Sequence, residues 1–291
     1  MTVLVTGVRG RVGGAVLRRL RAAGADVRAA SGSAEPVGAV GGEPPVRLDL
    51  AEPATFAPAL AGVRKVFLYA RPDTAGRFAR EAVAAGVEHV VLFSSLAIDE
   101  EGAERSPIAL QHRGAEDALR ASGLDWTFLR AGALASNALQ WAAPIRSGQG
   151  VRVAYPETYS EPVHEGDVAE VGVRALLDDD LRGRVLRITG PESLPARRQA
   201  ELIAAAAGID VPVERVGRDE HRASLTAALP GPVADFLLDF QRKRDGVPGT
   251  PLPDAERVLG RRPASFAEWA REHAATFRGR PGPAPAPAPR T

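Results

Sequence analysis

A glycine-rich turn close to the start of the chain constrains the fold more than any other feature. Residues 6–13 read TGVRGRVG, with three glycines at intervals of three. The apolar run Val3–Thr6 precedes this turn, and between Arg11 and Ala23 apolar residues recur every four positions, as in an amphipathic helix. Glycine suits a turn where the backbone bends tightly and where a helix packs directly on a strand. The segment therefore predicts an initial strand–turn–helix unit.

The rest of the N-terminal half continues this alternation. A Gly- and Pro-rich loop is expected at Gly32–Pro45. Short apolar runs alternating with helical patterns are typical of βαβ units and a parallel sheet. We therefore expect an α/β fold, a doubly wound, mostly parallel, Rossmann-like sheet over residues 1–130. The expected strands are Val27–Ala30, Val46–Leu48, Lys65–Ala70, Val90–Phe93 and Trp126–Leu129, and the expected helices are Thr74–Ala85 and Ile108–Ser122.

The pattern changes after about Arg130. Residues 131–165 are rich in loop-forming residues, and the last residues, 279–291, form a Pro/Ala tail that we expect to be disordered. Between them, residues 131–278 predict a smaller α+β substrate-binding lobe, interleaved with the sheet and not independent of it. Its expected helices are Asp167–Leu177, Gln199–Ala207, Ala227–Phe240 and Phe266–Phe277, and its expected strands are Val185–Thr189 and Val213–Val216.

Composition narrows the chemistry. The 291 residues include no cysteine, which excludes disulfides, zinc–thiolate sites, iron–sulfur clusters and a cysteine nucleophile. The 37 basic and 36 acidic residues nearly cancel, so no bulk charge attracts nucleic acid or a membrane surface. The five histidines lack metal-ligand spacing, and no apolar stretch reaches the length of a membrane span. We expect a cytoplasmic protein that acts on a planar or aromatic small molecule and holds no metal, and a homodimer is compatible with the sequence.

The turn itself predicts a ligand. Backbone N–H groups at a glycine-rich turn and at the following helix N-terminus are oriented to bind the diphosphate of a dinucleotide. An acidic residue at the end of the second strand, which would favour NAD, is missing, whereas Ser31 and Ser33 stand there and Arg9, Arg11 and Arg28 lie nearby in sequence. The sequence therefore favours NADP over NAD.

Further segments extend the pattern over residues 1–278. The motifs are TGVRGRVG at 6–13, LDL at 48–50, VFLY at 66–69, LFSS at 92–95, EDALRASGLDWT at 116–127, LRAG at 129–132, DVA at 167–169 and TGPE at 189–192. With these motifs in this order, the chain resembles the NmrA-like group of atypical short-chain dehydrogenases/reductases.

The resemblance implies roles for individual positions. The glycines would hold the diphosphate, Asp49 and Leu50 would meet the adenine, and the residues that end the fourth and fifth strands would border the ribose and nicotinamide. The expected cofactor-binding residues are Thr6, Gly7, Arg9, Gly10, Arg11, Val12, Gly13, Ser31, Ser33, Asp49, Leu50, Tyr69, Ala70, Arg71, Ser94, Ser95 and His112.

The proton-transfer machinery departs from the wider superfamily. Typical members carry a Tyr-x-x-x-Lys pair, in which the lysine lowers the pKa of a tyrosine that protonates a carbonyl. No such pair exists in this sequence, and the corresponding helix carries His112. Tyr155 and Tyr159, in the segment expected to close the substrate pocket, are further catalytic candidates because aromatic rings stack on planar substrates.

Three functions are compatible with these residues. The first is an NAD(P)H-dependent oxidoreductase that reduces a quinone, enone or activated carbonyl, since a reactive planar acceptor needs little help from an acid. The second is a non-redox enzyme, such as a cyclase, dehydratase or isomerase, on the same fold. The third is a regulatory protein that senses NAD(P) without turnover. We favour the first.

Overall fold

A seven-stranded, wholly parallel sheet forms the centre of the molecule. The computed structural model describes residues 1–33, 44–69 and 71–278. The strand order is β3-β2-β1-β4-β5-β6-β9: the chain adds β2 and β3 on one side of β1 and then β4, β5 and β6 on the other, so the order of the strands reverses between β1 and β4. This confirms the doubly wound α/β sheet, while the tail at 279–291 and Ala70 lie outside the described residues. The strands are β1 (Thr2–Val5), β2 (Val27–Ser31), β3 (Val46–Arg47), β4 (Val63–Tyr69), β5 (His89–Ser95), β6 (Asp125–Ala131) and β9 (Val185–Ile188).

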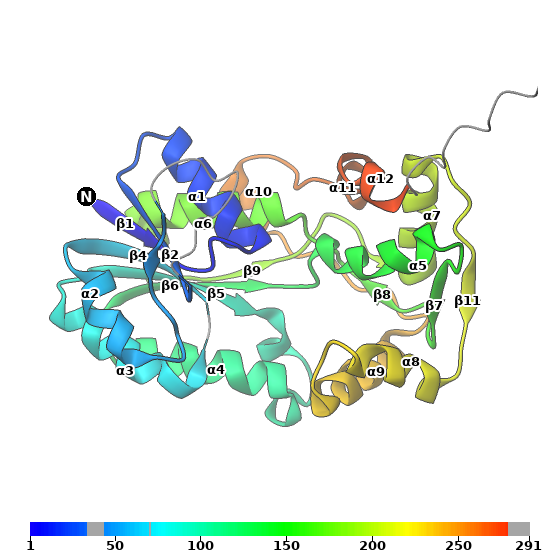
Figure 1. Ribbon diagram of the computed structural model, residues 1–291, viewed down its shortest axis with the longest axis horizontal. Helices are drawn as coiled ribbons and strands as arrows, with labels where there is room; N and C mark the ends of the chain where they lie inside the picture. The colour runs from blue at the N-terminus through cyan, green and yellow to red at the C-terminus, as the bar shows by residue number, and fades with distance from the viewer. Residues whose placement is uncertain (34–43, 70, 279–291) are drawn as a thin grey trace, which may run out of the picture.

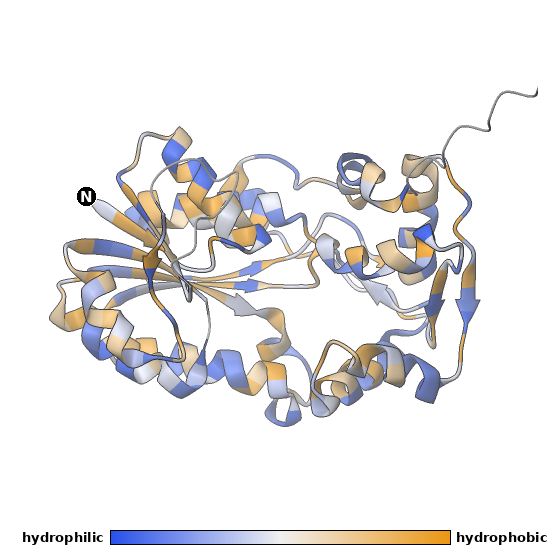
Figure 2. Ribbon diagram, in the orientation of Figure 1, coloured by the Kyte–Doolittle hydropathy of each residue, from blue (hydrophilic) through white to orange (hydrophobic). Residues whose placement is uncertain are grey.

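Helices cover both faces of this sheet (Figure 1). On one face lie α1 (Arg11–Ala22), α6 (Glu165–Leu177) and α10 (Asp254–Leu259); on the other lie α2 (Phe56–Leu60), α3 (Pro72–Ala84) and α4 (Pro107–Arg120). Each face has its own apolar core, which is why the central strands are nearly continuous in apolar residues. Figure 2 shows the apolar residues concentrated on the strands and on the inner sides of the helices.

A second, smaller lobe follows the sheet. Two short strand pairs frame it, β7 with β11 in parallel and β8 with β10 antiparallel. Its core contains the fully buried rings of Phe266, Trp269 and Phe277. The elements of this lobe are η4 (Ala135–Trp141), α5 (Ala142–Arg146), β7 (Val151–Val153), β8 (Tyr159–Ser160), β10 (Leu194–Pro195), α7 (Ala196–Ala207), β11 (Val213–Arg215), α8 (Arg218–Thr226), α9 (Gly231–Arg244), α11 (Phe266–Glu272) and α12 (Ala274–Phe277).

The structure differs from the sequence expectations mainly in the second half. Residues 131–165, expected as loop, contain η4, α5, β7 and β8. The helix expected from Ala227 begins at Gly231, because Pro230 lacks the N–H that a helix interior needs and stands directly before the helix. β9 and α6 lie within the main sheet layers, so the chain returns to the first lobe after starting the second. Among the described residues, no helix is both long and apolar enough to span a bilayer.

Candidate functional site

The glycine turn has room only for backbone. Gly7 has a φ of +64°, which L side chains rarely adopt, and a Cβ on Gly13 would stand 2.4 Å from the carbonyl oxygen of Gly7. The first helical hydrogen bond of α1 runs from Gly14 N–H to Gly10 O at 2.9 Å, and Gly10, the N-cap, makes no side-chain cap bond. The N–H groups of the first helical turn therefore have no partner within the helix, which suits them to bind a diphosphate.

Thr6 fixes the turn against the neighbouring strand. Its hydroxyl donates to the carbonyl oxygen of Phe67 and accepts from the N–H of Tyr69, both at 3.0 Å. Because Thr6 is buried, these two bonds satisfy its hydroxyl and join the carboxyl ends of β1 and β4. This is the crevice at which the strand order reverses and where open α/β sheets bind ligands.

Polar groups gather at the end of β2. The N–H of Ser33 donates to the Ser31 hydroxyl at 3.4 Å, and the guanidinium of Arg9 approaches the carbonyl oxygen of Ser33 at 3.5 Å. The Ser33 hydroxyl is buried without a partner among the described residues. Asp49 lies beside Gly32, and one oxygen of its carboxylate accepts from the N–H of Ala51 at 2.8 Å. The turn, Ser31, Ser33 and Asp49 are thus brought to one edge, as expected.

A buried ionic network supports the end of β5. The Ser94 hydroxyl donates to Glu116 on α4 at 2.7 Å, and Arg130 on β6 grips the same carboxylate at 2.6 and 2.9 Å. Arg120 adds a second cation at 3.0 Å from Glu116, and Arg130 also bonds Asp99 at 2.5 Å. Burial would raise the pKa of Glu116, but the hydrogen bonds from Arg130 and Ser94 and the nearby charges leave the pKa below its ordinary value. Glu116 is therefore an anion at neutral pH.

The two serines that end β5 differ in their hydrogen bonds. Ser94 is buried and its hydroxyl donates to Glu116, so its proton is not available to a ligand. Ser95 accepts from the N–H of Ala97 at 3.2 Å, and among the described residues no acceptor takes its own proton. Ser95 is thus the serine whose hydroxyl is available at this edge of the sheet.

His112 lies one helical turn before Glu116 on α4. Burial lowers its pKa to about 4, against a smaller opposing effect of the Glu116 charge. Its Nδ1 is buried and has no partner within the described part of the chain. The imidazole is therefore neutral at physiological pH, which leaves it a hydrogen-bonding role and removes the imidazolium as a proton donor.

The two candidate tyrosines, Tyr155 and Tyr159, contact other elements of the second lobe. The hydroxyl of Tyr155 accepts from Arg218 on α8 at 3.3 Å, and its ring packs on the small cluster of α8 and α9. Tyr159 belongs to β8 and pairs with Pro195 on β10. Their catalytic role stays a prediction.

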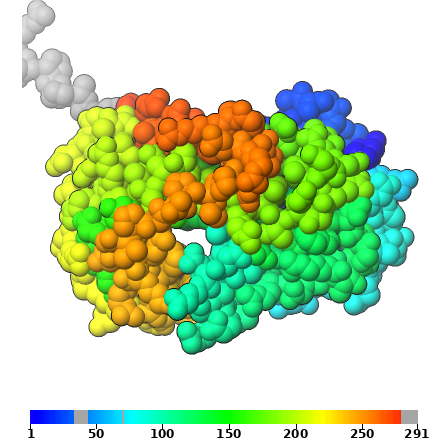
Figure 3. Space-filling view, turned by 180° about the vertical axis from the view of Figure 1, so that it is seen from behind, coloured from blue at the N-terminus to red at the C-terminus, as the bar shows by residue number. Residues whose placement is uncertain are grey.

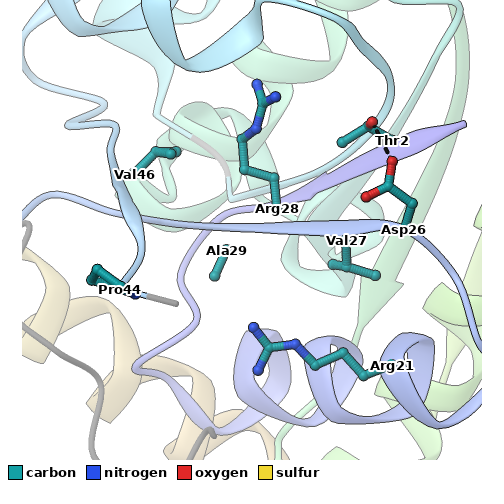
Figure 4. Close-up of a pocket in the computed structure, with 8 residues that line it drawn as sticks. All are labelled: Thr2, Arg21, Asp26, Val27, Arg28, Ala29, Pro44 and Val46. Carbon is teal, nitrogen blue, oxygen red and sulfur yellow. Dashed lines mark hydrogen bonds between the residues drawn. The ribbon is translucent and has the colours of Figure 1, made fainter. Parts of the chain in front are cut away.

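An opening lies between the surfaces of the two lobes (Figure 3). Figure 3 shows an opening between teal surface, where α4 and the turns before it lie, and the gold and orange surface of α9 and the segment after it. By contrast, the pocket in Figure 4, about 400 Å³, is lined by Thr2, Asp26, Val27 and Arg28, at the amino ends of β1 and β2. It lies at the edge of the sheet opposite the glycine turn and is not part of this site.

Sequence reasoning assigned no role to Glu116, Arg130 or Asp99. A signal was present, because Arg130 interrupts the apolar run of β6, and a charged residue in a strand buried on both faces requires a partner. That partner, Glu116, lies on a helix 14 residues earlier in the chain, and no local sequence pattern specifies the pairing.

Among the described residues, no group of three or more histidine, aspartate or glutamate side chains is arranged to hold a metal ion.

Fold and site together define a dinucleotide-binding protein of the Rossmann type. A family model described as NAD(P)H-binding matches residues 7–179. The (4-alkanoyl-5-oxo-2,5-dihydrofuran-3-yl)methyl phosphate reductase of Streptomyces griseus subsp. griseus is 37% identical over 280 residues, 94% of this chain and 99% of that protein. The chain thus belongs to the NAD(P)H-binding family, and it is an NAD(P)H-dependent reductase.

Solved structures share the fold at lower identity. An NADPH-dependent quinone oxidoreductase from Escherichia coli, complexed with NADPH, has a TM-score of 0.79 and 22% identity, covering 94% of this chain and 99% of that one. NmrA, a negative transcriptional regulator in complex with NADP, has a TM-score of 0.71 and 17% identity, covering 93% and 94%. These confirm the Rossmann-like fold and the resemblance to the NmrA-like group.

Proposed function

We propose that this reductase transfers hydride from NADPH to a planar, conjugated small molecule whose reduced form holds negative charge without an enzymatic acid. The observation that carries the proposal is that the sequence has no Tyr-x-x-x-Lys pair and that His112, which stands where a proton donor is expected, is buried. Its Nδ1 has no partner among the described residues, and burial lowers its pKa to about 4, so it has no proton to give as an imidazolium at pH 7.

Two acceptor classes meet this requirement. In an alkene activated by two carbonyl groups, hydride adds to the β-carbon, the C=C bond opens, and the electron pair spreads over both carbonyl oxygens until water supplies the proton. In a quinone, the electron pair becomes a stable phenolate. Bound NADPH supplies the hydride in either case. The chain supplies orientation, and the hydroxyl of Ser95 supplies a neutral hydrogen bond at the carboxyl end of β5.

The relatives support the same class of acceptor. The substrate named for the Streptomyces reductase is a 5-oxo-2,5-dihydrofuran with an alkanoyl group, an alkene activated by two carbonyl groups. The Escherichia coli structural neighbour is named for quinones, which are also planar and conjugated. We place the doubly activated enone first, because the Streptomyces protein matches along nearly its whole length at the higher identity.

NADPH is proposed as the preferred cofactor. The hydroxyl of Ser33 is buried without a partner among the described residues, and the guanidinium of Arg9 approaches the Ser33 carbonyl. Both groups lie beside the end of the second strand, the region that would receive the ribose 2′-phosphate. A hydroxyl that lacks a partner in a buried position costs free energy, which an anionic ligand would recover. We also propose a cytoplasmic location and a monomer or homodimer that needs no macromolecular partner, with Tyr155 and Tyr159 on the substrate side.

The test follows NADPH oxidation at 340 nm with three acceptors: a 3-acyl butenolide, a naphthoquinone and an unactivated saturated ketone. We expect turnover with the first two only, with deuterium from labelled NADPH appearing on the β-carbon of the butenolide. Reduction of the saturated ketone at a comparable rate would contradict the proposal, since that reaction needs an acid. Binding of NADPH without turnover of any acceptor would favour the sensor hypothesis instead.

A further inference from the structure

Tyr69, the last residue of β4, lies directly over the glycine turn. A Cβ built on Gly7 would stand 2.5 and 2.7 Å from the Cε2 and Cδ2 atoms of the Tyr69 ring. A Cβ on Gly10 would stand 3.4 Å from the Tyr69 hydroxyl oxygen. The ring therefore rests on the first glycine of the turn, and its hydroxyl reaches the second.

Several contacts hold this ring in place. The backbone N–H of Tyr69 is bonded to the Thr6 hydroxyl at 3.0 Å. The rings of Phe67 and Phe93 pack beside it, with centroids 6.2 and 5.1 Å away. The side chain thus has a defined position before any cofactor binds, which lowers the entropic cost of using it in binding.

The hydrogen bonds of the Tyr69 hydroxyl are incomplete. Its oxygen accepts from the backbone N–H of Gly13, in the first turn of α1. Among the described residues no acceptor takes its proton, although a phenol donates as well as accepts. Burial raises the pKa of Tyr69, against a smaller opposing effect of the Gly13 N–H, so the proton stays on the oxygen at physiological pH.

We propose that Tyr69 is a phosphate-binding residue, which accepts from Gly13 N–H and donates its own proton to a diphosphate oxygen of the cofactor. The missing acceptor is then the ligand itself. This places Tyr69 at the diphosphate, at the first glycine of the turn, and not at the ribose and nicotinamide implied by the family resemblance. It also gives Gly7 a second reason to lack a side chain, since a methyl group there would displace the ring.

The experiment measures dissociation constants of Tyr69→Phe for NADPH, NADH and 2′-AMP, using fluorescence and calorimetry. Losing one hydrogen bond to a charged oxygen should weaken both dinucleotides about 10-fold. Binding of 2′-AMP, which carries the 2′-phosphate but no diphosphate, should not change. Ser147→Ala is the control, because it also removes one hydroxyl, which donates to Pro144 O on the second lobe, and it should bind both dinucleotides like the wild type.

Unchanged binding of NADPH by folded Tyr69→Phe would overturn the proposal, and tighter binding would show that the hydroxyl competes with the diphosphate. A second measurement uses the wild-type protein alone: nuclear Overhauser contacts between the Tyr69 ring and Gly7 should persist when NADPH is added. Their loss would show that the ring is expelled and would equally overturn the proposal. The inference rests on NAD(P)H binding at the turn but not on the acceptor, so a failed acceptor assay leaves it intact.

Discussion

The carboxylate of Glu116 on α4 is fully buried against the guanidinium of Arg130 on β6, which bonds both of its oxygens, at 2.9 and 2.6 Å. The pair joins the helix that carries His112 to the strand beside β5, and Ser94 is bonded to it. The position of the β5 end, and with it the position of Ser95, therefore depends on one buried ion pair.

Replacing Glu116 by Gln should destabilise the protein strongly. The substitution leaves the buried Arg130 with Asp99 alone as a counter-charge, and breaking one side of a buried pair costs about 3–5 kcal/mol. Urea unfolding followed by circular dichroism measures this free energy. Asp117→Asn is the matched control, because Asp117 lies on the same helix and pairs with the same Arg120 but is largely exposed, so its loss should cost under about 1 kcal/mol. Equal effects of the two variants would refute the structural role of the pair.

Mild acid should destabilise the protein through its neutral histidines. Burial lowers the pKa of both His89 and His112 to about 4, whereas the unfolded chain takes up these protons near 6.5. The unfolded state thus binds more protons between these values, so the stability present above pH 6.5 declines as the pH falls toward 4. Glu116, with its pKa below the ordinary 4.5, adds a loss only at lower pH.

Urea midpoints at pH 7.5, 6.0 and 5.0 measure this decline. His112→Gln removes one of the two groups, so its midpoint should fall less steeply with pH than that of the wild type. If the urea midpoints of the two proteins fell equally with pH, His112 would have the same pKa in the folded and unfolded states.

Gly10→Val should abolish cofactor binding. A Cβ on Gly10 already stands 3.2 Å from the Gly7 carbonyl oxygen, and two further methyl groups would extend into the space that a diphosphate needs. We expect NADPH affinity to fall ~100-fold or more. Gly76→Ala on α3 controls for the loss of a glycine, since the nearest atom to its added Cβ is the end of the Arg80 side chain at 3.9 Å, and it should leave affinity unchanged. Retained binding by Gly10→Val would remove the turn from the cofactor site.

Ser33→Ala should weaken the binding of NADPH but not that of NADH. If the Ser33 hydroxyl receives the 2′-phosphate, its removal weakens NADPH by about 10-fold and leaves NADH unaffected, because one hydrogen bond to a charged group contributes roughly 1.5–3 kcal/mol. Ser147→Ala, whose hydroxyl donates to Pro144 O on the surface of the second lobe, is the control. An equal change for NADPH and NADH would place the hydroxyl away from the 2′-phosphate.

What the sequence determined by itself is the sheet and its glycine turn. β1, α1, β2, β4, β5 and β6 lie within a few residues of their expected ranges. The reason is local: the spacing of glycines and the period of apolar residues act within one element or between neighbours in sequence. The absence of a Tyr-x-x-x-Lys pair is likewise a property of the sequence alone.

Tertiary structure decided which polar groups meet. Ser94 and Ser95 are neighbours in the chain with the same chemistry, yet Ser94 donates to Glu116, whereas the Ser95 hydroxyl has no acceptor in the part of the chain that the structure describes. The neutral state of His112 comes from burial by elements distant in sequence, and Tyr69 reaches Gly7 only because β4 lies beside β1. Protonation and hydrogen bonding depend on the three-dimensional surroundings of an atom, and those surroundings exist only once the chain has folded.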